Sequence, residues 1–109
     1  MGREFYEIKP EKTIHIPGIR KKIDIFCNRD GLYYTNLIYK WKNYGVSMDI
    51  DLSKRAKTIP ELLEKIKGQL SIERNRMDRK NSNLVWTGLV YLRDEIKQYK
   101  PQLNYEVIN

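Results

Sequence analysis

Residues 33–52 read YYTNLIYKWKNYGVSMDIDL, and apolar side chains alternate with polar ones on both sides of Gly45. A period of two is typical of a β-strand with one buried face. The glycine-containing turn between the two runs predicts a β-hairpin. We expect Trp41 to pair with Val46, because this register places the apolar residues of both strands on one face.

The chain before this hairpin continues the same pattern. Residues 19–27 alternate in the same way and end in an Asn-Arg-Asp-Gly turn. We expect this strand to pair along its length with the next one, with Ile25 opposite Thr35, to give a three-stranded antiparallel meander. Residues 4–8 and 13–16 are shorter β-prone pieces that predict one or two further edge strands.

After residue 52 the period of the pattern changes to that of helices. Residues 58–61, Thr-Ile-Pro-Glu, form a capping box, which predicts a helix that runs to about Lys80. Residues 81–83, Asn-Ser-Asn, predict a turn and the cap of a second helix. That helix ends before Pro101. Residues 84–92 would also suit a buried strand, but the smooth continuation through Lys100 favours a helix.

The fold class that follows is α+β: an antiparallel β-meander of three to five strands, followed by a C-terminal helical hairpin packed on one sheet face. A chain of 109 residues is expected to form a single domain over 1–109, with strands over about 4–52, helices over about 59–99 and a tail at 101–109. An apolar stripe on the second helix would pair with the first helix or equally with a second copy, in a homodimer; it comprises Val85, Leu89, Leu92 and Ile96.

The charge balance is the main indication of a partner. Twenty-one Lys and Arg against 14 Asp and Glu give a formal charge of +7. Such a field favours polyanions, so nucleic acid or an acidic or nucleoprotein partner is expected. A single cysteine, Cys27, and the lack of an apolar N-terminal run or membrane-length segment indicate a cytoplasmic protein with no membrane partner.

The residues give little basis for catalysis. His15 is the only histidine, and Cys27 falls on the predicted core face, so neither a nucleophile–base pair nor a zinc site can be assembled, and no cofactor or metal is expected. The enzyme alternative is a metal-dependent nuclease. On the predicted register Asp24, Asn36 and Asp51 lie side by side on the outer sheet face, with Asp49 one row away.

A binding surface is a better interpretation of the outer sheet face. Basic and aromatic side chains alternate there, which combines phosphate contacts with base stacking. The predicted nucleic-acid-binding residues of this face are Arg20, Lys22, Phe26, Tyr34, Lys40 and Lys42. Two basic runs around the first helix form a second candidate patch, namely Lys54, Arg55 and Lys57, and Arg74, Arg76, Arg79 and Lys80.

The β-β-β-α order of residues 19–70 is similar in outline to the arm-type DNA-binding domains of phage and transposon integrases, which lay three strands into a groove of DNA. The likeness is one of element order. Two functions therefore remain open from the sequence: a small, non-enzymatic nucleic-acid-binding module, or a phage or mobile-element protein that inhibits a host protein or nucleoprotein complex by protein–protein binding.

Overall fold

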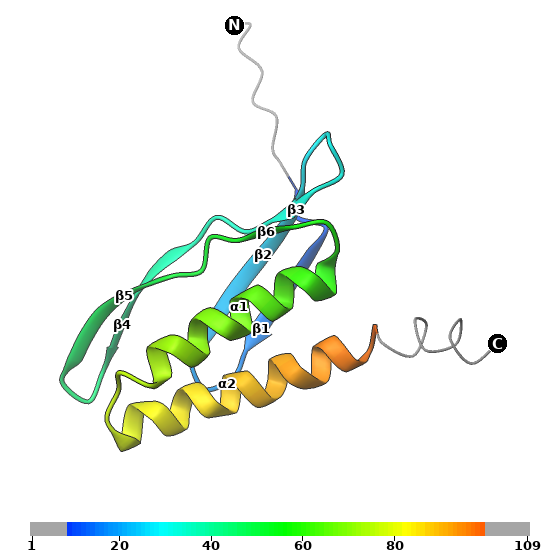
Figure 1. Ribbon diagram of the computed structural model, residues 1–109. Coiled ribbons are helices and arrows are strands. Elements are labelled where there is room, and N and C mark those ends of the chain that lie inside the picture. The colour runs from blue at the N-terminus through cyan, green and yellow to red at the C-terminus, as the bar shows by residue number, and fades with distance from the viewer. Residues whose placement is uncertain (1–8, 100–109) are drawn as a thin grey trace, which may run out of the picture.

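The structure is a computed structural model, and it describes residues 9–99. An antiparallel sheet is followed by two helices that pack on one of its faces (Figure 1). The predicted α+β class is therefore confirmed. The predicted strand at 4–8 and the tail at 101–109 lie outside the described residues.

The strands fall into two sheets, and the two strands of the second sheet are inserted in the chain between the last two strands of the first. One sheet has the order β1-β2-β3-β6 and the other the order β4-β5. The strands are β1 Lys12–Ile16, β2 Lys21–Cys27, β3 Tyr33–Tyr34, β4 Ile38–Asn43, β5 Val46–Asp51 and β6 Arg55–Ala56. Because β3 leads into β4 and β5 leads into β6, residues 33–56 form one long hairpin with a break in the middle.

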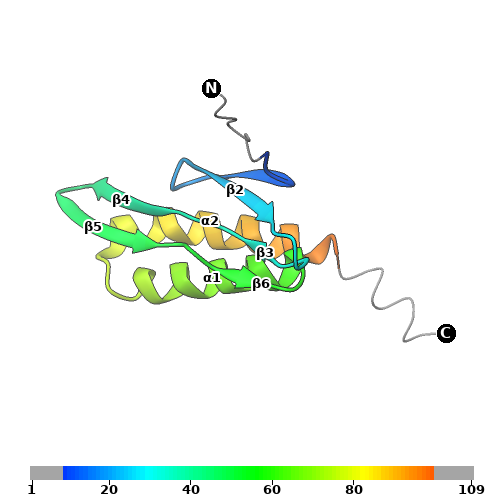
Figure 2. The ribbon, with the colours of Figure 1, turned by 90° about the horizontal axis from the view of Figure 1, so that it is seen from above.

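The predicted pairing of β2 with the next strand is correct only at its start. Phe26 pairs with Tyr34 and Cys27 with Tyr33, but the expected pair of Ile25 with Thr35 does not form. The physical reason is the break in the long hairpin, where the hydroxyl of Thr35 donates to the carbonyl oxygen of Leu52 and accepts from the backbone N–H of Lys54. From that point β4 diverges from β2, and Figures 1 and 2 show the β1–β2 hairpin and the β4–β5 hairpin spreading apart.

The hairpin of β4 and β5 has a register two residues away from the predicted one. Trp41 faces Met48, not Val46, and Asn43 faces Val46. The turn contains only Tyr44 and Gly45, with φ of 51° and 78°. Two positive φ values fit the tight turn that matches the twist of a hairpin. A shift of two residues keeps every side chain on its predicted face, so the predicted core face was correct although its pairs were wrong.

The helices are α1 Ile59–Arg74 and α2 Arg79–Lys97. Thr58 caps α1 as predicted, through a hydrogen bond from the backbone N–H of Glu61. The turn predicted at 81–83 is wrong, because Asp78 caps α2 by accepting from the N–H of Asn81 at 2.9 Å. Asn81 itself is buried within α2, where its side-chain oxygen accepts from the Trp41 indole N–H at 2.8 Å.

One apolar core joins the helices to the sheets. It contains inward-facing residues of β1, β2, β4 and β5 together with the stripes of both helices. The predicted stripe of α2, Val85, Leu89, Leu92 and Ile96, is buried in this core. Because these residues are covered by their own chain, they are not available to pair with a second copy. None of the helices over residues 9–99 is long and apolar enough to cross a membrane.

Candidate nucleic-acid interface

Three connections meet at one end of the molecule: the β1–β2 turn at 17–20, the β4–β5 turn, and the α1–α2 connection at 75–78 (Figure 1). The first two enclose a small hollow together with Leu84 of α2. The third lies close to the β4–β5 turn: the ammonium of Lys80, in the first turn of α2, lies 5.3 Å from the centre of the Tyr44 ring. Segments far apart in the sequence therefore lie together at this end of the molecule.

The β1–β2 turn fits against α2 because it contains a glycine. Gly18 has a φ of +87°, and a Cβ at this position would lie 2.3 Å from the carbonyl oxygen of Leu84. Arg20 also has a positive φ, of 52°, a conformation that a non-glycine residue adopts only at some cost in energy. The turn thus fixes where the Arg20 side chain leaves the backbone.

This end of the molecule carries most of the exposed cations of the two predicted patches. We call it the basic end, and it comprises Arg20, Lys21, Lys22, Lys40, Lys42, Arg76, Arg79 and Lys80. Two carboxylates offset it in part, because Asp49 faces Lys40 across the hairpin and Asp78 caps α2. The basic end joins four residues of the first predicted patch with three of the second.

A depression of about 310 Å³ lies between the start of β2 and β4 at the basic end. It exists because these two strands diverge instead of pairing. Four cations line it, together with the aromatic rings of β4; the cations are Arg20, Lys21, Lys40 and Lys42. Cations held around one hollow favour a phosphate there, since each adds to the same positive field.

Tyr39 forms part of the aromatic floor of the depression, and its phenol does not ionise. The Tyr39 side chain is 8% exposed, and its hydroxyl has no hydrogen-bond partner among the described residues. Burial raises the pKa of this phenol well above its ordinary range, so Tyr39 stays neutral. The ammonium of Lys21 lies 5.4 Å from the ring centre. The depression thus offers positive charge and apolar surface.

Asp78, the N-cap residue of α2, keeps its negative charge at the basic end. The backbone N–H and the side-chain amide of Asn81 both donate to the carboxylate of Asp78. These hydrogen bonds hold the pKa of Asp78 below its ordinary value of 3.8. Asp78 therefore stays ionised and bound to its own helix, which leaves the neighbouring Arg79 and Lys80 exposed.

The two predicted aromatic residues lie elsewhere on the outer face, where β2 meets β3. Phe26 and Tyr34 stack with ring centres 5.5 Å apart and planes inclined by 29°. Arg55 faces Tyr34 from β6. Lys22 and Phe26 are four residues apart on one strand, which corresponds to about 13 Å. The stack and the basic end are therefore within reach of one short oligonucleotide.

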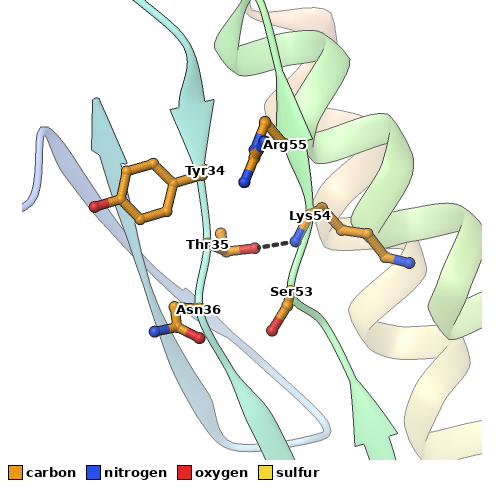
Figure 3. A pocket seen from close by; sticks show the side chains of 6 residues that line it. All are labelled: Tyr34, Thr35, Asn36, Ser53, Lys54 and Arg55. Atoms are coloured by element: carbon orange, nitrogen blue, oxygen red, sulfur yellow. Dashed lines mark hydrogen bonds between the residues drawn. The ribbon is translucent and has the colours of Figure 1, made fainter. Parts of the chain in front are cut away.

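The remaining predicted residues do not join this surface. Lys54 extends toward the helices, where its ammonium donates to the side-chain oxygen of Gln69 at 2.9 Å (Figure 3). Lys57 is exposed before α1, at the opposite end from the basic end. The guanidinium of Arg74 donates to the carbonyl oxygen of Ser82 and lies 5.0 Å from the centre of the Trp86 ring, so it braces the two helices.

The predicted cation site on the outer face does not form. Asp24 accepts a hydrogen bond from Thr13 at 2.7 Å, and Asp51 accepts from the N–H of Ser53. Because β2 and β4 diverge, Asp24 does not lie beside Asn36 and Asp51. Within residues 9–99 no three His, Cys, Asp or Glu side chains come close enough to hold a metal ion.

Sequence reasoning missed Lys21, because strict alternation from Ile19 places it on the inner face. Lys21 does pair with the buried Ile16, as the alternation requires, but β4 diverges from β2 at this point, so the Lys21 side chain is only half-buried and lines the depression. The joining of the two basic patches was also missed, since it depends on long-range packing.

No protein-family model, curated protein or solved structure matches the chain.

Proposed function

We propose that this protein is a small, non-enzymatic nucleic-acid-binding module. The observation that carries the proposal is the basic end, where eight cations lie in or near three connections and the described residues add two carboxylates. A phosphate backbone carries one negative charge per nucleotide and releases counterions when lysine and arginine replace them. The half-buried rings of the Phe26–Tyr34 stack add surface on which a base or sugar can rest.

The test is a fluorescence-anisotropy titration of short single- and double-stranded DNA and RNA at several salt concentrations. The wild-type protein is compared with a Lys40→Glu/Lys42→Glu variant. A Lys57→Glu/Lys97→Glu variant is the matched control, because it changes the net charge equally with exposed residues at the other end of the molecule. Circular dichroism checks that all three proteins are folded.

We expect the affinity of the wild-type protein to fall steeply with salt. The basic-end variant loses two phosphate contacts, so the slope of log K against log salt should flatten by about 1.4–1.8. The control variant should keep most of the affinity and the slope. Equal losses in the two variants would show that only overall charge matters, and lack of binding even at low salt would refute the proposal.

A second candidate function, inhibition of a host protein or nucleoprotein complex, is favoured by a different surface. Between the outer sides of α1 and α2 lies an apolar groove of about 220 Å³ that includes Trp86, Leu89 and Val90. Trp86 is 50% exposed, and exposed tryptophans are common at the centre of protein interfaces. A Trp86→Ser change should weaken binding to such a partner and leave oligonucleotide binding unchanged.

A further inference from the structure

The break in the long hairpin opens a pocket on the outer face that is separate from the basic end. Its volume is about 550 Å³, within the range of about 300–1,000 Å³ typical of small-ligand sites. The six lining residues are Tyr34, Thr35, Asn36, Ser53, Lys54 and Arg55. In Figure 3 the side chains of Tyr34, Asn36 and Arg55 extend to the same side of the two strands, away from the helices.

The walls of this pocket are held by side-chain hydrogen bonds, which add to the two backbone hydrogen bonds that cross the break, from Thr35 to Lys54 and from Leu52 to Leu37. The Thr35 hydroxyl is bonded to the backbone on the opposite strand at both its donor and its acceptor. The Ser53 hydroxyl accepts from the N–H of Leu37 at 3.1 Å. Because these two hydroxyls are occupied, they fix the shape of the pocket and are not its free recognition groups.

Three groups remain for a ligand, and each suits a different part of a nucleotide. Tyr34 is stacked on Phe26, so its ring is already ordered as a platform for a planar group. The exposed Asn36 amide makes no hydrogen bond among the described residues, and it is a donor and an acceptor side by side, as a base edge requires. The exposed Arg55 guanidinium suits a phosphate or a base face.

The pocket lies on a path to the basic end. Asn36, Lys40 and Lys42 share the outer face of the same chain segment, and the four residues from Asn36 to Lys40 span about 13 Å. On one side this path is bounded by Asp49 and Asp51 of β5, which repel a phosphate backbone. A nucleic-acid strand with one base in the pocket therefore reaches the cations of the basic end with its backbone.

We infer that this pocket is a nucleobase subsite and that the protein prefers single-stranded nucleic acid. A base in a duplex is stacked on both faces and paired along its Watson–Crick edge, so it cannot present a free face to Tyr34 or that edge to Asn36. An unpaired base can do both. The inference rests on the proposed function, because the basic end supplies the backbone contacts.

The test compares three DNA ligands of about 12 nucleotides or base pairs at one salt concentration: oligothymidine, an abasic single strand of the same length, and a duplex. The wild-type protein is measured beside Tyr34→Leu and Lys40→Glu/Lys42→Glu, each checked for folding by circular dichroism. The abasic strand keeps the charge of oligothymidine and lacks only the bases, so it isolates the contribution of the pocket.

We expect the wild-type protein to bind oligothymidine roughly ten-fold tighter than either other ligand. Tyr34→Leu should remove this preference and leave the affinity for the abasic strand unchanged. The basic-end variant should weaken binding of all three ligands. Equal binding of oligothymidine and the abasic strand, or a preference that survives Tyr34→Leu, would overturn the subsite while the proposed function stands. Failure to bind any ligand would overturn both.

Discussion

The α-carbon of Gly18 lies so close to α2 that an added Cβ would meet the Leu84 carbonyl oxygen at 2.3 Å. Its φ of +87° is also one that L-residues rarely adopt. Space and backbone conformation both exclude a side chain here. The position of Arg20 and of the depression beside it depends on this contact, because the same turn carries both.

A Gly18→Ala change should therefore destabilise the protein more than glycine's backbone preference alone explains. Gly31→Ala is the matched control, since Gly31 has a similar φ of +82° but no atom within 4 Å of an added Cβ. We expect about 1–2 kcal/mol for Gly31→Ala and at least about 2 kcal/mol more for Gly18→Ala, measured by urea unfolding. Equal losses would mean that the turn moves away from α2 without cost.

At the scale of the elements, the long hairpin of residues 33–56 shows which structural features can be predicted from the sequence and which cannot. Alternation placed the inward residues of β4 and β5 correctly, because strand periodicity is local. The break at Thr35 and Ser53 was not visible, since it depends on hydroxyls that bond to backbone on the opposite strand. The helix boundary was missed for the same reason: the burial of Asn81 under Trp41 is a tertiary contact.

The hydroxyl of Thr35 should contribute more than that of an ordinary strand threonine. Thr35 is 4% exposed, and its hydroxyl bonds to two backbone groups. Thr35→Val keeps the shape but leaves those groups unpaired, so we expect a loss of about 2–3 kcal/mol in urea unfolding. Thr13→Val is the control, because Thr13 is exposed and bonds to Asp24; it should cost less than about 0.5 kcal/mol. Similar costs would contradict a structural role for the break.

At the scale of the whole molecule, the distribution of the positive charge matters more for binding and for stability than the net charge does. Of the candidate site, the sequence identified the cations and the outer face, because both are set by composition and alternation. It did not place Lys80 of α2 beside Tyr44 of the β4–β5 turn, since this depends on how α2 packs against the sheets. Repulsion among these cations opposes folding and is screened by salt.

We therefore expect added salt or a polyanion to raise the unfolding temperature. A relieved repulsion of about 1 kcal/mol corresponds to about 4–8 °C for a domain near this size. The Lys40→Glu/Lys42→Glu variant should show a smaller rise than Lys57→Glu/Lys97→Glu, measured by differential scanning fluorimetry. An unfolding temperature that does not change with salt in the wild-type protein would contradict a repulsive cluster.

The short strand β1 has a consequence for self-association. Among the described residues it forms one edge of its sheet, and an exposed edge is a template on which further chains can add strand by strand. Pro10 and Pro17 flank β1, and neither has an N–H to offer to an incoming strand. The ammonium of Lys12 is held by Glu95 of α2 at 3.2 Å, which ties this edge to the helix layer. Over residues 9–99 the sheet therefore ends at β1, and the flanking prolines together with the Lys12–Glu95 pair oppose the growth of fibrils from this edge.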